Sequence, residues 1–199
     1  MKKQILSLII ALFFFNNVNA ITYNSDPKIF ITELIEDAIK TLSDKDLNKD
    51  EKSKTIRKIA IENVDIDSLG MYTLGDIRKT LKTEKLNEYK ILFKEYFLKS
   101  LTSRLIDYSS NKFEIINAEK KSSNYTIVKS KIVASTNKPE IKIDWRIYTK
   151  NPDKPLIRDL IVEGLSLART QKEEFASILN SNNNDVNILI AKLEEFINN

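Results

Sequence analysis

Hydrophobic residues recur at helical spacing over the first part of the chain, from about residue 25 to residue 108. Ser25 or Asp26 can cap a first helix, and Pro27 suits its first helical position. A polar segment separates this helix from a second one with a narrower apolar face. The apolar residues are Phe30, Ile31, Leu34, Ile35, Ala38, Ile39 and Leu42 in the first helix, and Ile56, Ile59 and Ala60 in the second.

A longer helix is predicted from about Glu84 to Tyr108, after a short stretch that contains Gly70 and Gly75. Because the chain has only three glycines, we expect each of these two to allow a bend or a close approach between segments. The apolar face of the long helix is unusually aromatic for a helix that only fills a core. It comprises Leu86, Tyr89, Phe93, Tyr96, Phe97, Leu101, Leu105 and Tyr108.

From Lys112 onward the hydrophobic period changes from helical to alternating, which predicts four strands separated by short polar turns. Short connections indicate an antiparallel meander. In the third strand, Ile143 and Trp145 share one face while Asp144 and Arg146 share the other, so one face of the sheet should be buried. The predicted strands span residues 113–118, 125–134, 141–149 and 157–163.

Two further helices are predicted at the C-terminal end, one beginning near Thr170 and one after the run from Asn182 to Asn184. This order is typical of an α+β fold, with N-terminal and C-terminal helices packed on one face of a curved, antiparallel four-stranded sheet. Large apolar groups should then face the space between the long helix and the sheet. They either fill an ordinary core or line an apolar cavity for a ligand, and they are Tyr72, Tyr89, Phe93, Tyr96, Phe97, Tyr108, Trp145 and Phe175.

The first twenty residues have the pattern of a secretory signal peptide. Lys2 and Lys3 precede an apolar run over residues 5–15, and small residues end the segment at Ala20. The run is too short for a membrane span of about 20 residues, although an uncleaved anchor remains the alternative. We therefore expect residues 1–20 to be a cleaved signal and residues 21–199 to form one exported domain.

Composition excludes several kinds of chemistry. The chain has no Cys and no His, so disulfides, Ser-His and Cys-His nucleophile pairs and the commonest metal ligand are all missing. About 180 residues are enough for one core without disulfides. The formal net charge is +4, of which Lys2 and Lys3 would be lost with the signal, leaving +2. So small a charge predicts no nucleic-acid partner.

Apparent catalytic and metal motifs are incomplete. The acidic run from Asp44 to Asp50 resembles the start of a calcium loop, but Lys49 and Thr55 occupy the positions of its Gly and Glu. Ser166 follows Gly164 as in a nucleophile elbow, yet no His is present to activate it. Asp144 and Asp159 remain, each either a member of a surface ion pair or a buried base. We expect no metal site and no catalytic group of the familiar kinds.

The chain resembles the MlaC, or toluene-tolerance, family of periplasmic phospholipid-binding carriers over nearly all of residues 21–199. The resemblance is clearest in Leu69-Gly70-Met71-Tyr72, in the aromatic face of the long helix, and in the segment from Arg158 to Gln171 followed by Glu174-Phe175. Lys172 and Glu173 stand where an Arg commonly precedes the Glu-Phe pair. The run from Asn182 to Asn184 replaces the family's Gly between the last two helices, as Asn tolerates left-handed backbone.

The resemblance implies a periplasmic carrier that is not an enzyme and needs no cofactor, with phospholipid as its cargo. Its family shuttles lipid between an outer-membrane lipoprotein–porin complex and an inner-membrane ABC-type transporter with its substrate-binding ring, which maintains outer-membrane lipid asymmetry. Two alternatives stay open: a small isomerase or hydratase with Asp159 as its base, and a non-catalytic secreted adaptor. We expect the lipid to contact Tyr72, Phe93, Tyr96, Phe97, Leu101, Val128, Ile132, Ile143, Trp145, Ile147, Leu160 and Val162.

Overall fold

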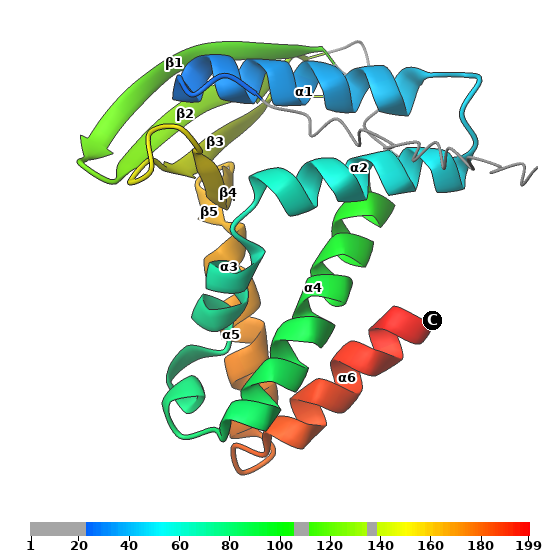
Figure 1. The fold of residues 1–199 in the computed structure, drawn as a ribbon, viewed down its shortest axis with the longest axis vertical. Coiled ribbons are helices and arrows are strands. Elements are labelled where there is room, and N and C mark those ends of the chain that lie inside the picture. The colour runs from blue at the N-terminus through cyan, green and yellow to red at the C-terminus, as the bar shows by residue number, and fades with distance from the viewer. Residues whose placement is uncertain (1–22, 106–111, 135–138) are drawn as a thin grey trace, which may run out of the picture.

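The computed structural model describes residues 23–105, 112–134 and 139–199 (Figure 1). The expected signal peptide at residues 1–20 lies outside the described residues, as does Tyr108 of the expected aromatic face. Within the described residues, no helix is both long enough and apolar enough to cross a membrane.

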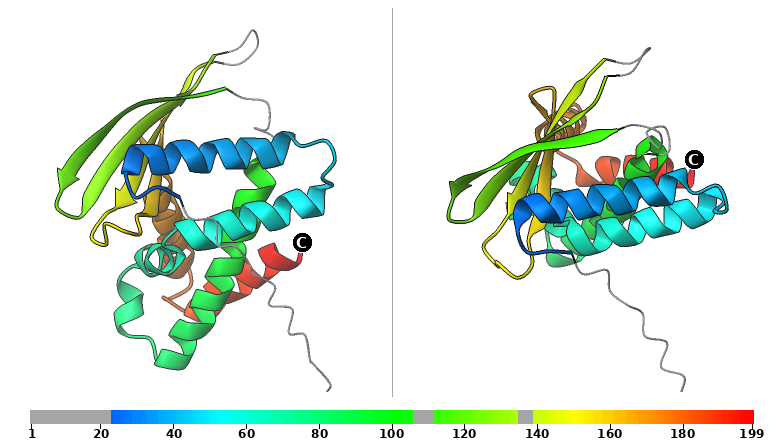
Figure 2. Two further views of the ribbon diagram at one scale, coloured as in Figure 1. Left: turned by 45° about the horizontal axis from the view of Figure 1, so that its top comes forward. Right: turned by 90° about the horizontal axis from the view of Figure 1, so that it is seen from above.

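Two N-terminal helices form an antiparallel pair that lies side by side in both views of Figure 2. Helix α1 spans Pro27–Ser43, and the side chain of Asp26 caps it by accepting hydrogen bonds from the N–H groups of Lys28 and Ile29. Helix α2 spans Lys49–Asn63 and begins with a capping box in which Asn48 and Glu51 satisfy each other's backbone N–H groups. The predicted cap is thereby confirmed, and each helix buries its predicted apolar face, with Ala38 and Ile39 only partly buried.

A short helix, α3 (Ile66–Thr73), and a 3-10 turn, η1 (Gly75–Lys79), follow where the sequence indicated only a short stretch with two glycines. Gly70 lies inside α3 against the long helix, and a Cβ there would come within 2.7 Å of the Phe93 ring. Gly75 has a φ of +67°, which favours glycine. Both glycines therefore serve the close approach and the bend that their scarcity predicted.

The long helix α4 spans Thr83–Leu105, and the C-terminal helices are α5 (Leu167–Asn180) and α6 (Val186–Asn198). The turn between α5 and α6 places Asn183 and Asn184 at positive φ, 53° and 57°. Asn tolerates this backbone better than other non-glycine residues. The Asn run thus adopts the positive φ values that a glycine would otherwise provide at this turn.

The sheet is antiparallel with its strands in chain order, and it has five strands rather than the four that we expected. The extra strand has only two residues and pairs with the preceding strand across a turn at Glu163 and Gly164, whose φ values are 49° and 81°. Two successive positive φ values match the two-residue hairpin turn of type I′. The strands are β1 (Phe113–Ser122), β2 (Tyr125–Ile132), β3 (Ile141–Tyr148), β4 (Leu156–Val162) and β5 (Leu165–Ser166).

The strands curve over α1, which crosses one face of the sheet, while α3 to α6 extend away from the sheet in Figure 1. Helix α4 packs on α6, α3 and α2 instead of on the sheet. The expectation that the long aromatic helix covers the sheet is therefore wrong. Amphipathic spacing shows that a helix has an apolar face, but it does not show which element covers that face.

Two groups of buried side chains result from this arrangement, and Val64 packs against both. The helix cluster has side chains from each of the helices α2 through α6. It consists of Ala60, Ile66, Leu74, Tyr89, Phe93, Leu98, Phe175, Leu179, Val186, Leu189, Ile190 and Leu193. The sheet cluster joins α1, α2 and the strands and consists of Phe30, Ile31, Leu34, Ile35, Leu42, Ile56, Ile59, Val128, Trp145, Ile147 and Ile157.

Candidate functional site

The concave face of the sheet, which α1 covers, is closely packed at one end. Strand register places Thr126 opposite Ile147, and Ile147 opposite Ile157. All three side chains are buried, and Ile147 is fully so. In the next row Val128, also fully buried, lies opposite Trp145. Phe30 and Ile31 of α1 belong to the same cluster, so this end of the face offers no room for a ligand.

Toward the other end of the same face several apolar side chains are only partly buried, although on β2 Ile132 is 5% exposed and Ser130 is 1% exposed. Ile143 lies opposite Val162 on β4, and Ile141 lies opposite Ile132 on β2. On β1, Phe113 and Ile115 are likewise only partly buried although both pack against the sheet cluster. Apolar surface left partly open at one end of a packed face is where an apolar ligand can enter.

A pocket of about 300 Å³ opens at this end, between α1 and β1. Its walls are mostly apolar, with the charged side chains of Glu36 and Lys112 among them. Apolar walls with a few polar groups are typical of small-molecule sites, and 300 Å³ is at the lower end of their size range. The pocket is lined by Thr32, Ile35, Glu36, Ile39, Lys112, Phe113 and Ile115.

One polar pair lies on the concave face beside this pocket. The indole N–H of Trp145 donates a hydrogen bond of 2.9 Å to the hydroxyl oxygen of Ser130. The Ser130 hydroxyl in turn donates to the backbone carbonyl of Ile143 at 3.0 Å. Ser130 is 1% exposed, so this chain of two bonds satisfies polar groups that would otherwise be buried without partners.

The residues expected to contact lipid fall into separate places. Seven lie on the concave face, and those with partly exposed side chains border the open end. Four lie on α4, where their face meets α5 and α6 in the helix cluster, so the structure does not bring them to the sheet. The sheet group is Val128, Ile132, Ile143, Trp145, Ile147, Leu160 and Val162, and the α4 group is Phe93, Tyr96, Phe97 and Leu101.

Ring contacts explain why the α4 group stays in the helix cluster. The ring centroids of Tyr96 and Phe196 are 4.9 Å apart, and those of Phe93 and Phe175 are 6.3 Å apart. Burial, followed by the nearby charge of Glu174, raises the pKa of Tyr96. The aromatic face that suggested a cavity wall is thus the contact surface for the two C-terminal helices.

Tyr72, the remaining expected residue, lies on α3 and is 43% exposed. The Nζ atom of Lys172 is 5.1 Å from its ring centroid, close enough for a cation–π contact. A second, shallow hollow of about 330 Å³ lies here, lined by Asp67, Ser68, Met71, Tyr72 and Arg78. Three of its five lining residues, Asp67, Ser68 and Arg78, are polar or charged, and it lies on a different element from the pocket between α1 and β1.

Sequence reasoning missed the pocket residues themselves. Ile35 and Ile39 belong to the predicted stripe of α1, and Phe113 and Ile115 alternate along β1. The signal was therefore present, because both sets are apolar and periodic. What the sequence did not reveal is that α1, rather than the aromatic α4, covers the sheet.

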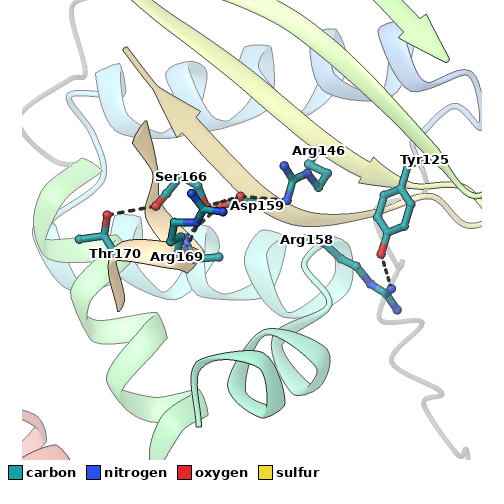
Figure 3. Close-up of polar contacts among 8 residues, drawn as sticks. Tyr125, Arg146, Arg158, Asp159, Ser166, Arg169 and Thr170 are labelled. Atoms are coloured by element: carbon teal, nitrogen blue, oxygen red, sulfur yellow. Dashed lines mark hydrogen bonds and ion pairs between the residues drawn. The ribbon is translucent and has the colours of Figure 1, made fainter. Parts of the chain in front are cut away.

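Asp159 is buried on the opposite face of the sheet, where it joins β4 to the start of α5 (Figure 3). The Ser166 hydroxyl donates to one carboxylate oxygen at 2.6 Å, and the Ala168 N–H donates to the other at 3.0 Å. Arg146 lies 3.5 Å away. Of the two roles left open for Asp159, the structure shows an ion pair, but the residue is only 5% exposed, so the pair is not a surface one.

Ser166 acts as the N-cap of α5, accepting a hydrogen bond from the Arg169 N–H at 3.0 Å (Figure 3). Such a bond to backbone is the ordinary role of a serine at a helix N-cap. Both oxygens of its partner Asp159 accept bonds from groups that hold the β4–α5 junction. The arrangement fixes this junction and faces away from the apolar pocket.

Arg158 joins the sheet to α3. It donates to the Tyr125 hydroxyl at 2.8 Å and pairs with Asp65 (Figure 3 shows the former). Its guanidinium carbon lies 3.5 Å from the centroid of the Tyr148 ring. Burial lowers the pKa of Arg158, but the bonds to Tyr125 and Asp65 outweigh it, so the pKa stays above its ordinary value. No group of acidic residues in the described ranges is arranged to hold a metal ion.

Comparisons with a family model, with curated proteins and with solved structures show what this chain is similar to. A family model described as MlaC protein matches residues 32–195. The chain belongs to the MlaC family. No curated protein sequence matches this MlaC family member significantly. Among solved structures, it matches the phospholipid-binding protein from Ralstonia solanacearum in complex with a phospholipid, at 18% identity and a TM-score of 0.68, covering 84% of this chain and 94% of that one. At so low an identity, the structural match concerns the fold.

Proposed function

We propose that this MlaC family member is a phospholipid carrier that holds acyl chain in the pocket between α1 and β1. The observation that carries the proposal is the graded packing of the concave face, which is closed around Ile147 and open around Ile115. Membership of the MlaC family supports it. So does the structural relative from Ralstonia solanacearum, which is a phospholipid-binding protein in complex with a phospholipid.

The physical need for such a pocket follows from the lipid. Two sixteen-carbon chains have about 30 methylenes, and leaving them in water costs on the order of 20 kcal/mol at about 0.8 kcal/mol each. A carrier offsets this cost by covering the chains with apolar side chains such as Ile39 and Phe113. The charged groups of Glu36 and Lys112 at the same pocket suit a position near the polar head group.

The cellular role that we propose is transfer of phospholipid across the periplasm. The protein would be exported by the signal at residues 1–20 and would take part in maintaining outer-membrane lipid asymmetry. Its partners would be an outer-membrane lipoprotein–porin complex and an inner-membrane ABC-type transporter with its substrate-binding ring. Each partner must offer the acyl chains an apolar environment equal to the pocket, since otherwise release would be too costly.

The proposed function involves no catalysis and no cofactor. The chain has no His or Cys, and Ser166 is bound to a carboxylate and to a helix N-terminus. The alternative of an isomerase or hydratase requires Asp159 to face a ligand. Instead, Asp159 lies in register with Arg146 on the face away from the pocket, and its oxygens accept two bonds. This geometry favours the carrier over the enzyme.

Lipid analysis of the protein recovered from the periplasm of its native host tests the proposal. We expect the exported protein to begin near Ile21 and to contain phospholipid at about one molecule per chain. Native mass spectrometry gives the ratio, and extraction followed by thin-layer separation gives the lipid class. Protein that emerges folded and free of lipid would favour the non-catalytic adaptor, and intact Met1 in the membrane fraction would contradict export by a cleaved signal.

A further inference from the structure

Trp145 lies on the concave face, one row from Ser130 and Ile143 and one row from Thr126 and Ile147. It is the only tryptophan in the chain. The row beyond it, Thr126 and Ile147, is buried, whereas Ile143, two residues before it on the same strand, is only partly buried. The indole itself is 9% exposed. Ser130, which bonds to this indole, lies opposite Ile115 of the pocket wall, so a large rigid side chain lies one row behind that wall.

The orientation of this indole is fixed by a buried partner. Ser130 lies one row closer to the open end on the neighbouring strand, directly opposite Ile143. Its hydroxyl accepts the indole N–H at 2.9 Å and donates to the Ile143 carbonyl at 3.0 Å. Turning the ring away would leave buried donor and acceptor groups unsatisfied, which is costly. Ser130 therefore fixes the orientation of Trp145 behind the row formed by Ile115 and Ile143.

We propose that Trp145 is the closed end of the acyl-chain site and sets the length of chain that the protein accepts, with Ser130 as its positioning residue. The inference rests on the proposed function, because it takes an acyl chain as the ligand. A chain that enters between α1 and β1 passes Ile115 and Ile143 and meets the indole with its methyl end. Longer chains must leave methylenes in water at the mouth, so they bind less well.

Fluorescence of the wild-type protein tests the position of Trp145 without any substitution. Bromine atoms quench tryptophan emission on contact, and Trp145 is the only emitter of its kind in the chain. Two otherwise identical phospholipids are compared, one brominated near the methyl end of the chain and one brominated near the carbonyl. We expect stronger quenching by the methyl-end bromine, with mass spectrometry confirming equal loading.

Two outcomes separate this inference from the proposed function. Equal quenching by both lipids, or stronger quenching by the carbonyl-end bromine, would overturn the role of Trp145 while leaving the carrier function intact. Failure of either lipid to bind would overturn the proposed function, and the inference with it.

Chain-length preference provides the second test. Trp145→Leu replaces the indole with a much smaller side chain, so the most favoured acyl chain in a mixture of phospholipids should become longer. Ser130→Ala keeps the indole but frees it, and it should broaden the range of accepted chains and shift the emission of Trp145. Leu98→Val is the control, because Leu98 is buried in the helix cluster and its substitution perturbs the core without touching the sheet face. An unchanged preference in both Trp145→Leu and Ser130→Ala, with lipid still bound, would contradict the proposal.

Discussion

The guanidinium of Arg158 lies 2.7 Å from a carboxylate oxygen of Asp65, which links strand β4 to the N-cap of helix α3. The same carboxylate accepts a hydrogen bond from the Ser68 N–H at 3.2 Å. Burial raises the pKa of Asp65, but the bonds from Arg158 and Ser68 and the charge of Arg158 together lower it below its usual value. Strand and helix are thereby joined by the Asp65 carboxylate, which stays ionised to a lower pH in the folded protein than in the unfolded chain.

This lowered pKa predicts how stability depends on pH. Asp65→Asn should lower the free energy of unfolding by about 1–3 kcal/mol at neutral pH, between the values for exposed and buried pairs. The pKa of Asp65 is lower in the folded protein than its unfolded value of about 3.9. The ion pair therefore contributes its full stabilisation above about pH 3.9 and loses it as pH falls through the folded-state pKa. The difference in unfolding free energy between wild type and Asp65→Asn, measured by urea denaturation, should therefore fall toward zero at acidic pH.

The control for this prediction is Asp76→Asn, which removes an exposed carboxylate paired with Lys79 on η1. It should leave stability unchanged at neutral pH, since exposed pairs contribute little. A gap for Asp65→Asn that stays constant down to strongly acidic pH would show that the substitution acts through packing and not through charge.

Gly70→Ala should destabilise the helix cluster. The added methyl would lie 2.7 Å from Cδ1 of the Phe93 ring, so the ring or α3 has to move, at a cost of about 1–3 kcal/mol. Thermal or urea denaturation measures the loss. Phe93→Leu shortens the clashing side chain, so it should lower the free energy of unfolding less in the Gly70→Ala background than in wild type. Strict additivity of the two losses in a double-mutant cycle would contradict the proposed contact.

The local part of this fold could be predicted from the sequence. Asp26 and Pro27 mark the start of α1, and the alternation from Ile143 to Arg146 assigns the two faces of β3 correctly. These features depend on neighbouring residues, so a single sequence shows them. Helix α3 was not predicted because it has only eight residues, with Gly70 among them. Strand β5 was not predicted because two residues cannot show a hydrophobic period.

The site was predicted less well for a different reason. The concave face was found, since Ile143, Trp145 and Leu160 all lie on it. The partner of that face was misassigned, because α1 and α4 both have apolar faces of suitable length. The choice between them depends on contacts made far along the chain, such as Tyr96 against Phe196. Helical periodicity contains no information about such contacts.

Asp159 and Ser166 should matter for stability and not for chemistry. Ser166→Ala removes the cap of α5, at about 1–2 kcal/mol. Asp159→Asn weakens the buried pair with Arg146 and should also destabilise, whereas Asp153→Asn in an exposed turn should not. Because Ser166 and Asp159 bond to each other, the double variant should lose less stability than the two single losses combined.

Lipid analysis completes this prediction. Phospholipid vesicles incubated with pure wild-type protein should be recovered covalently unchanged, and both single variants should still transfer lipid if they remain folded. Accumulation of lysophospholipid or free fatty acid with wild-type protein, and its loss with Ser166→Ala, would instead identify an enzyme.

Narrowing the pocket should reduce the amount of lipid bound. Val128→Trp is unsuitable, because Val128 is fully buried and a larger side chain would disrupt the core. Ile115 lines the pocket and is only partly buried, so Ile115→Trp can fill space that the acyl chain would occupy without displacing packed neighbours. Lipid per protein, measured by mass spectrometry after equal exposure to vesicles, should fall several-fold while circular dichroism stays unchanged.

The neighbouring residue supplies the matched control for that substitution. Ile116 is 51% exposed and does not line the pocket, so Ile116→Trp adds the same side chain to the same strand outside the proposed site. It should bind as much lipid as wild type. Equal losses in the two variants would mean that tryptophan on β1 disturbs the sheet in general, and full loading of Ile115→Trp would place the acyl chain elsewhere. Because the two positions adjoin on one strand, a loss confined to Ile115 distinguishes occupation of the pocket from damage to the sheet.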